Sequence, residues 1–320
     1  MTSALVVDGL LALLVLGLAL RVTFARTDYG SAVGFMGYGL LLALVWVRLA
    51  AVDVALTEAA VGTGLTGFLL LGAAARLAPG ESFDAPGAPG FGSRILVGLL
   101  CGVVAAGLGA VVLSLPDPAP TLAPLVAENL PPTEVANPIT GVLMAHRAVD
   151  TLLETVVLIP ALIGIWSLAS DSGWGGRPGS LPLLRSSGPL TLLAQVLPPF
   201  GILVGIHLVW VGADEPGGKF QGAAVLAAMW VLVLVAGLRR PPAVIGQRLR
   251  LLVVLGPLVF LGIGIAGIWL ARAFLAYPEG WAKPLILTIE AALTLSLALV
   301  LGMILAGPPA VDRSDPKVGP

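Results

Sequence analysis

The run "ITGVLMAHRAVDTLLETVVL", residues 139–158, places four ionisable side chains in an otherwise apolar stretch: His146, Arg147, Asp150 and Glu154. His146, Asp150 and Glu154 follow one another at intervals of four residues, so on a helix they share one side. Arg147 precedes Asp150 by three residues and falls on that side too. At about 1.5 Å per residue this ladder covers roughly 12 Å of depth. Histidine and a desolvated carboxylate can both titrate near neutral pH, so the spacing suits protons or a small cation moving in steps.

A buried ion-pair cluster that only fixes helix packing would use the same residue types. Arg147 supplies one positive charge against the two carboxylates, so pairing within the helix leaves one carboxylate that needs a proton, a cation or another partner. An ionised side chain at the bilayer centre costs at least roughly 2.5–3.5 kcal/mol on insertion scales. Both interpretations stay open, and the unbalanced charge favours a functional one.

Other apolar stretches carry lone acids. "VDVALTEAAVG" places Asp53 at the mouth of a predicted span and Glu58 deeper, with Thr57 in reach of a hydrogen bond to Asp53. Glu290 lies in "LILTIEAALTL", a few residues inside the last predicted span. Glu58 and Glu290 are deep enough to be desolvated, which makes them candidates for the same pathway. Asp53 could instead reach the lipid headgroups.

The composition predicts an all-α integral membrane protein. The chain has 320 residues, of which 58% are hydrophobic and 11% charged, and its mean hydropathy is +1.01; an average globular chain is roughly 25% charged. A net charge of −1 offers no basic surface for nucleic acid. The single cysteine, Cys101, can form no disulfide within the chain, and no metal-binding or redox spacing is present, so we expect no metal and no cofactor.

Nine segments are apolar enough to cross a bilayer, which takes about 20 residues. The first reads as a retained span rather than a signal peptide. With the N-terminus outside, most Lys and Arg residues fall in inner loops, and only four, Lys219 among them, in outer loops. This predicts an N-out, C-in topology. The predicted spans are residues 4–22, 32–50, 53–76, 95–114, 138–166, 190–211, 220–238, 251–271 and 285–306.

Two stretches rich in Gly, Pro and Ser divide the chain, and we interpret them as flexible linkers. No polar interval is long enough for a soluble domain. The predicted organisation is a three-helix block at 1–76, a linker at 77–94, a two-helix block at 95–168, a linker at 169–189, a four-helix block at 190–308 and a disordered tail at 309–320.

The connection "ADEPGGKFQG" reads as a tight turn at Pro216, Gly217 and Gly218. A helix is expected to restart at about Phe220 and Gln221. The small residues from Gly222 onward would let another helix approach closely. The segment lacks the Lys-Ser/Thr ending of a phosphate loop.

Three stretches together resemble a known family. "VDVALTEAAVGTGLTGFLLL" resembles the first membrane block at the C-terminal end of the large A subunit of Mrp-type cation/proton antiporters, which occurs as a separate small subunit in membrane-bound hydrogenases. "NPITGVLMAHRAVDTLLETVVL" resembles the next block, and "EPGGKFQGAAVLAA" is similar to the glycine turn of the antiporter's B subunit. Their order fits a fusion of the A-subunit tail with the antiporter's B subunit.

The resemblance carries over residue by residue. Positions that match the family's acids, charged helix and turn are Glu58, Arg147, Asp150, Thr151, Glu154, Pro216, Gly217, Gly218, Phe220, Gln221 and Gly222. Positions that depart from it are Ala145 in place of an acid, His146, Ala148 and Val149 in place of Phe, Gly and Phe, and Leu153, Lys219 and Ala223 in place of glycines.

The resemblance implies a membrane subunit of a multisubunit Na⁺/proton antiporter or antiporter-like module in a bacterial or archaeal plasma membrane, and not an enzyme. Arg147 would stabilise ionised carboxylates, and Asp150 or Glu154 would exchange protons. The chain lacks the large domain of the pumping subunits, with its broken helices and Lys–Glu pair, and we expect no intramembrane lysine. Such a pumping subunit would be a partner. A redox-driven complex, such as a membrane-bound hydrogenase or a complex I relative, and a purely structural scaffold are the alternatives.

Overall fold

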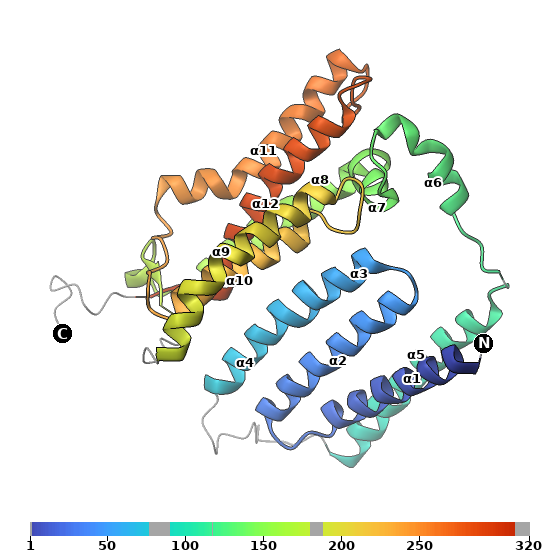
Figure 1. Ribbon diagram of the computed structural model, residues 1–320. Helices are drawn as coiled ribbons and strands as arrows, with labels where there is room; N and C mark the ends of the chain where they lie inside the picture. The colour runs from blue at the N-terminus through green and yellow to red at the C-terminus, as the bar shows by residue number, and fades with distance from the viewer. Residues whose placement is uncertain (1, 77–89, 117, 180–187, 311–320) are drawn as a thin grey trace.

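The computed structural model describes residues 2–76, 90–116, 118–179 and 188–310. Its first block is a hairpin of two long helices followed by a third span (Figure 1). The third span contains a π-helix in its middle. The elements are α1 (Thr2–Thr23), α2 (Asp28–Arg48), α3 (Val52–Thr57), η1 (Glu58–Leu65) and α4 (Thr66–Arg76).

Local signals explain the ends of these helices. Thr27 caps α2, its hydroxyl accepting a hydrogen bond of 3.1 Å from the Gly30 N–H. Arg48, in the last turn of α2, forms an ion pair of 2.8 Å with Asp8 of α1. The ion pair joins the N-terminal part of α1 to the C-terminal end of α2.

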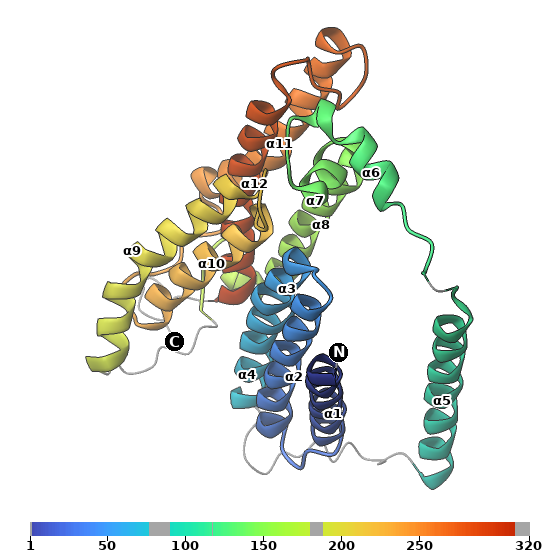
Figure 2. The same cartoon turned by 45° about the vertical axis from the view of Figure 1, so that its right-hand side comes forward.

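Helix α5 (Phe91–Ser114) stands apart from the rest of the chain. Each of its residues is exposed, and in Figure 2 a wide separation lies between it and the first block. The short helix α6 (Ala123–Asn129), the 3₁₀ turn η2 (Pro131–Thr133) and α7 (Pro138–Gly141) lead back to the remaining helices. Helix α7 is capped by Asn137, whose side chain accepts a hydrogen bond of 2.9 Å from the Ile139 N–H.

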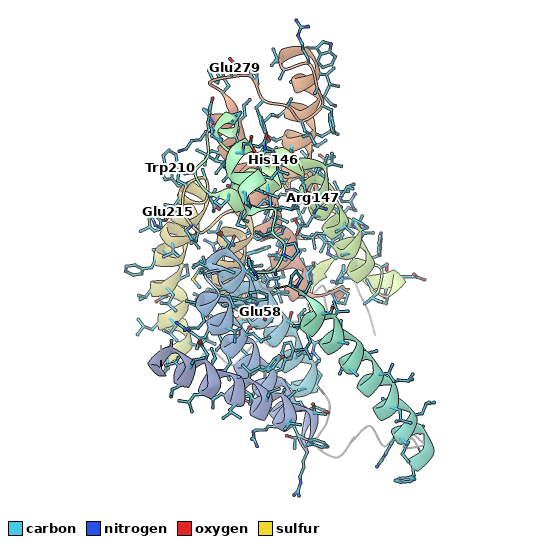
Figure 3. All side chains as sticks on the ribbon, turned by 90° about the vertical axis from the view of Figure 1, so that its right-hand side faces the viewer. Glu58, His146, Arg147, Trp210, Glu215 and Glu279 are labelled. Atoms are coloured by element: carbon cyan, nitrogen blue, oxygen red, sulfur yellow. The ribbon has the colours of Figure 1, made fainter. Side chains whose placement is uncertain are left out.

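The charged stretch is not one regular helix. Residues Val142–His146 form a π-helix, η3, and Arg147 has φ −127° and ψ 35°, outside the helical region. The α-helix α8 runs from Ala148 to Trp166. The sequence prediction of a continuous helix from Pro138 is therefore wrong at this point. Figure 3 shows His146 and Arg147 at this break.

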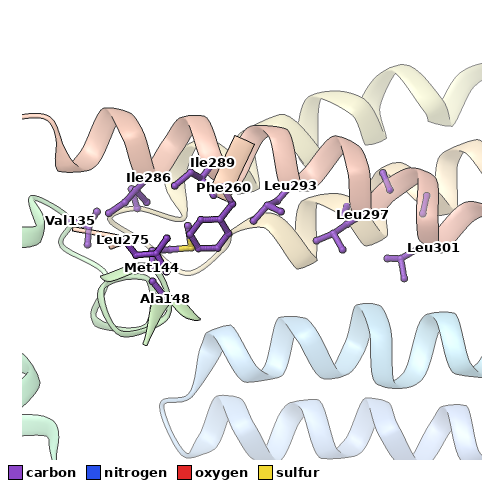
Figure 4. Close-up of a cluster of buried hydrophobic side chains, with 14 residues drawn as sticks. Val135, Met144, Ala148, Phe260, Leu275, Ile286, Ile289, Leu293, Leu297 and Leu301 are labelled. Atoms are coloured by element: carbon purple, nitrogen blue, oxygen red, sulfur yellow. The ribbon is translucent and has the colours of Figure 1, made fainter. Parts of the chain in front are cut away.

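The last block surrounds α12 (Ala282–Ala306), which packs against α8, α9 (Gly188–Val211), α10 (Lys219–Val235) and α11 (Gln247–Leu270). The largest cluster of buried apolar side chains runs along it and includes Phe260, Ile286 and Leu293 (Figure 4). Lipid is as apolar as these side chains, so helix association in a membrane depends on close packing and interhelical hydrogen bonds. Accordingly, the Ser296 hydroxyl donates to the Val253 carbonyl of α11.

Short polar segments connect the ends of this block. The turn η4 (Asp171–Gly173) precedes β1 (Arg177–Pro178), which pairs antiparallel with β2 (Pro309–Ala310). Parts of the predicted 169–189 linker and of the predicted 309–320 tail are thus ordered. Most of the predicted 77–94 linker, residues 180–187 and residues 311–320 lie outside the described residues.

All nine segments predicted from the apolar pattern are helical, and the chain is an all-α membrane protein. Eight helices in the described part are long and apolar enough to cross a bilayer. The remaining one, α10, has 17 residues, somewhat fewer than the about 20 that span a hydrocarbon core. No topology follows from these helices alone, so N-out, C-in stays a prediction.

Gly256 of α11 should be intolerant of a side chain. A Cβ added there would lie 2.8 Å from the Leu293 Cα and 2.9 Å from the Ser296 Cβ, both on α12. Gly256→Ala is therefore expected to destabilise the protein by about 1–3 kcal/mol through overpacking. Gly262→Ala, on the same helix with no atom within 4 Å of the new Cβ, is the control. Thermal unfolding in detergent measures both, and equal midpoints would contradict the packing described.

Candidate functional site

Four segments that are distant in the sequence meet around a cavity of about 250 Å³. Helix α3, the α7–η3–α8 segment and the α9–α10 turn with the facing part of α12 form its wall. Apolar side chains line part of it, and its polar lining consists of Asp53, Thr57, Thr140, Glu154, Lys219, Gln221 and Glu290. The three stretches that carry the family resemblance therefore come together at one place.

The glycine turn brings the backbone close enough to build this wall. Gly218 has φ +124°, which side chains rarely allow, and its N–H donates to the Leu208 carbonyl at 2.8 Å. A Cβ on Gly217 would lie 2.5 Å from that same carbonyl oxygen. The Gly217 N–H donates to the Asp53 carboxylate at 3.0 Å. Glycine at both positions lets the turn fold back on α9 and reach the first block.

Gln221 strengthens the contact between α10 and α3. Its amide nitrogen donates to the Thr57 hydroxyl at 3.0 Å and to the Asp53 backbone carbonyl at 3.3 Å. The Thr57 hydroxyl in turn donates to that carbonyl at 2.9 Å. Thr57 thus bonds to Asp53 as the spacing predicts, through the backbone oxygen.

The α7 end of the charged stretch is fastened to the same turn. The Asn137 side chain donates to the carbonyls of Gly212 and Glu215 at 3.2 and 3.0 Å, while its oxygen caps α7. The Thr140 hydroxyl donates to the Gly212 carbonyl at 2.5 Å. These bonds satisfy backbone groups of an irregular segment, as a low-dielectric environment requires.

Two oppositely charged side chains are buried at the cavity. Lys219 and Glu290 are each only 3% exposed. Lys219 Nζ lies 4.8 Å from the centroid of the Phe220 ring, and Glu290 Oε2 has no hydrogen-bond partner. Among the described residues, no ion pair within 4.0 Å joins Lys219 to a carboxylate. The two charges face the cavity without direct contact.

The burial of Lys219 corrects a sequence prediction. The charge count placed this residue in an outer loop, but it is the first residue of α10 and its side chain is buried. The expectation of no intramembrane lysine stays a prediction. The apolar run that starts directly after it is the signal that could have located it, because a helix beginning at the glycine pair must include it.

All four side chains of the predicted ladder are exposed, and one of them also borders the cavity. Glu154 lines the cavity. Arg147 and Asp150 form an ion pair of 2.5 Å whose side chains are 70% and 54% exposed. His146 is exposed beside them. The break at Arg147 alters the register between His146 and α8, so the four side chains do not form one continuous row, whereas Asp150 and Glu154 remain one turn apart on α8.

Glu58 is not among the residues that line the cavity. It lies in η1, and the space for its carboxyl group comes from glycines: a Cβ on Gly62 would lie 2.7 Å from Glu58 Oε1, and one on Gly39 of α2 would lie 3.3 Å away. The neighbouring Thr63 hydroxyl is buried without a partner. Figure 3 shows Glu58 on the first block, away from the labelled charges of the η3–α8 segment.

Charged and phenolic groups in the connections between helices link neighbouring segments. Asp214 pairs with Lys283 at 2.5 Å, and this hydrogen bond lowers the pKa of the Asp214 carboxyl. The Tyr277 hydroxyl donates to the Met144 carbonyl at 2.7 Å. Burial, and then the charge of Glu290, raise the pKa of Tyr277, so it keeps this donor at neutral pH. The bond anchors the π-helix η3 to the α11–α12 connection.

Family models match two parts of the chain. Residues 13–79 match MbhD, described as the D subunit of MBH, and residues 189–307 match MnhB, a domain related to the MnhB subunit of a Na⁺/H⁺ antiporter. An uncharacterised protein of Methanocaldococcus jannaschii is 30% identical over 156 residues, which are 44% of this chain and 60% of that relative. The chain thus spans less than two thirds of its relative's length. These matches confirm the resemblance to Mrp-type antiporter and membrane-bound hydrogenase subunits.

Two solved structures share the fold. A chain of the Mrp complex from a Dietzia species has a TM-score of 0.73 at 23% identity, with 96% of this chain and 35% of that chain covered. A chain of the membrane-bound sulfane sulfur reductase, an archaeal respiratory membrane complex, has a TM-score of 0.53 at 22% identity, with 67% of this chain and 97% of that chain covered.

Gln221→Leu should weaken the joint between α10 and α3. The change leaves the Asp53 carbonyl and the Thr57 hydroxyl without their amide donor, which is expected to cost about 1–3 kcal/mol. Gln195→Leu, on an exposed position of α9, is the control for the same chemical change. Thermal unfolding and limited proteolysis compare the two, and a Gln221 variant as stable as the Gln195 variant would show that this joint contributes little.

Proposed function

We propose that this chain is a membrane subunit of an Mrp-type cation/proton antiporter or of a related ion-translocating complex, and that its cavity is one station of a proton or monovalent-cation pathway. One observation carries the proposal: carboxylates from three distant segments, Asp53, Glu154 and Glu290, line one cavity inside an apolar protein. The proposed role is transport rather than catalysis.

Buried acids support passage better than they support packing. Glu290 is almost fully buried and one of its oxygens has no partner, an arrangement that costs stability. A packing role would be served by an apolar side chain of similar volume. A group that takes up and releases a proton or a cation needs an oxygen without a fixed partner, and Glu290, which lines the cavity, has one.

The remaining charged residues extend this pathway in the proposal. Asp53 contacts the glycine turn, and in the predicted N-out, C-in topology this end of α3 lies on the outer side of the membrane. Arg147, Asp150 and His146 follow Glu154 on the exposed face of the η3–α8 segment. Glu58 would belong to a separate branch in the first block. Na⁺ and H⁺ are the proposed ions, and a bacterial or archaeal plasma membrane the proposed location.

The exposed charges support a subunit rather than an independent transporter. An ion pair open to lipid at the depth of Arg147 and Asp150 is costly, so another protein must cover this face. Helix α5 has no buried residue, which also favours a partner that covers it. The Mrp-complex chain is much longer than its matching region. We propose that the covering partners are other antiporter-type subunits, including a proton-pumping subunit with broken helices.

A redox-driven complex is the second candidate. The MbhD match and the fold shared with a chain of the sulfane sulfur reductase favour it. Genes for iron-sulfur or nickel-iron subunits next to this one would support this candidate, whereas antiporter genes alone would support the first.

Glu290→Gln and Glu154→Gln should each reduce Na⁺-dependent proton flux in inverted vesicles roughly tenfold or more, because a positioned proton-transfer group is removed. Glu128→Gln, at an exposed position of α6, is the matched control. Native gels check assembly. Normal flux in both cavity variants would contradict the pathway, and loss of assembly in place of flux would favour a scaffold.

Leu153, exposed on α8, should face a partner. In a Cys101→Ser background, Leu153→Cys is expected to cross-link to another membrane subunit with a short bifunctional maleimide in the native complex. After dissociation in detergent the same cysteine should react with the maleimide but form no cross-link to another subunit. Free labelling by a lipid-soluble maleimide in the intact complex, without cross-linking, would show that lipid covers this face.

A further inference from the structure

We propose that the Lys219 ammonium group takes the place of a monovalent metal cation in the cavity, so that this site accepts protons and excludes Na⁺ and K⁺. The inference rests on the proposed role of the cavity in ion passage and specifies what passes. Any transport of a metal cation by the complex would then follow another route.

The position of Lys219 makes its charge part of the site. It begins α10 directly after the glycine turn, and its side chain is buried at the cavity together with that of Glu290. Exposed Glu154 lines the same cavity, so two carboxylates share this space with the ammonium group. A lysine carries a compact charge with three donors on a flexible stem, which resembles a tethered monovalent cation.

The ammonium group is not used up by an ion pair. It lies over the Phe220 ring, and Glu290 Oε2 remains without a partner. A lysine that only neutralised a buried acid would be expected in direct contact with it, since a buried pair repays its desolvation only with good geometry. Lys219 instead balances the charge of several acids around one space.

Several oxygens that could bind a metal cation already accept hydrogen bonds on the Asp53 side. The Gly217 N–H binds the Asp53 carboxylate, and the Gln221 amide binds both the Thr57 hydroxyl and the Asp53 carbonyl. Hard cations need several oxygen ligands. Sodium would compete with these donors and also lie beside an ammonium group within about 250 Å³. A proton needs neither change, because it binds directly to a carboxylate oxygen.

The test measures binding on the purified whole complex. Lys219→Met keeps the length of the side chain and removes its charge. We expect saturable ²²Na⁺ binding in this variant, in excess of wild type by one site per complex. The excess should vanish in Lys219→Met/Glu290→Gln. Lys283→Met, which removes the lysine paired with Asp214 outside the cavity, should bind as wild type does. Equal binding by wild type and Lys219→Met would overturn the proposal.

A second measurement works on the wild-type protein and needs no variant to fold. A hydrophobic carbodiimide modifies protonated buried carboxyl groups, and mass spectrometry locates the adduct. Na⁺ should not protect Glu290 from modification in wild type, whereas it should protect Glu290 in Lys219→Met. Protection in wild type would overturn the inference and leave the pathway standing. Unchanged proton flux in Glu290→Gln would instead overturn the pathway, whatever the binding result.

Discussion

The hydrogen bond from the Gly217 N–H to the Asp53 carboxylate joins the first block of the protein to the last. It exists because two glycines let the turn fold back against the Leu208 carbonyl. Gln221 and Asn137 then hold α3 and α7 to the same turn. Lys219 follows the glycines directly, so this backbone geometry also determines where the buried ammonium group lies. The charge distribution of the cavity thus follows from the shape of one turn.

Irregular backbone occurs in this chain where polar side chains are concentrated. Both π-helices, η1 and η3, contain or border charged residues of the predicted pathway. A π-helix redirects the side chains that follow it, and such segments are frequent at functional sites. Glu58 opens η1 five residues after Asp53 and does not line the cavity. In the α7–η3–α8 segment the break falls at Arg147, ahead of Asp150 and Glu154, which stay one turn apart on α8. Both are exposed, and Glu154 alone of the charged residues in this segment also lines the cavity.

The apolar pattern predicted the helices well because a bilayer requires long runs of apolar residues, and the motif order predicted which segments matter. The Thr57 contact followed from local spacing. The apolar run after Lys219 indicates a helix that begins beside it, but a charge next to a glycine turn is equally compatible with an exposed loop, so the burial of Lys219 could not be read from the sequence. The break at Arg147 and the separation of Glu58 depend on packing between distant segments, such as the bond from Tyr277 to Met144, and no local pattern encodes them.

Two of the longest helices, α1 and α5, contribute no buried side chain among their described residues. In water such helices would be unstable, but in lipid a helix satisfies its own backbone hydrogen bonds and can exist before it finds a partner. The chain can therefore present α5 and the Arg147–Asp150 face in advance of assembly. Burial of that ion pair then requires a protein surface with polar groups of its own. The charges of Arg147 and Asp150 are unfavourable in a span surrounded by lipid. They therefore favour binding of a chain that offers polar groups to this face.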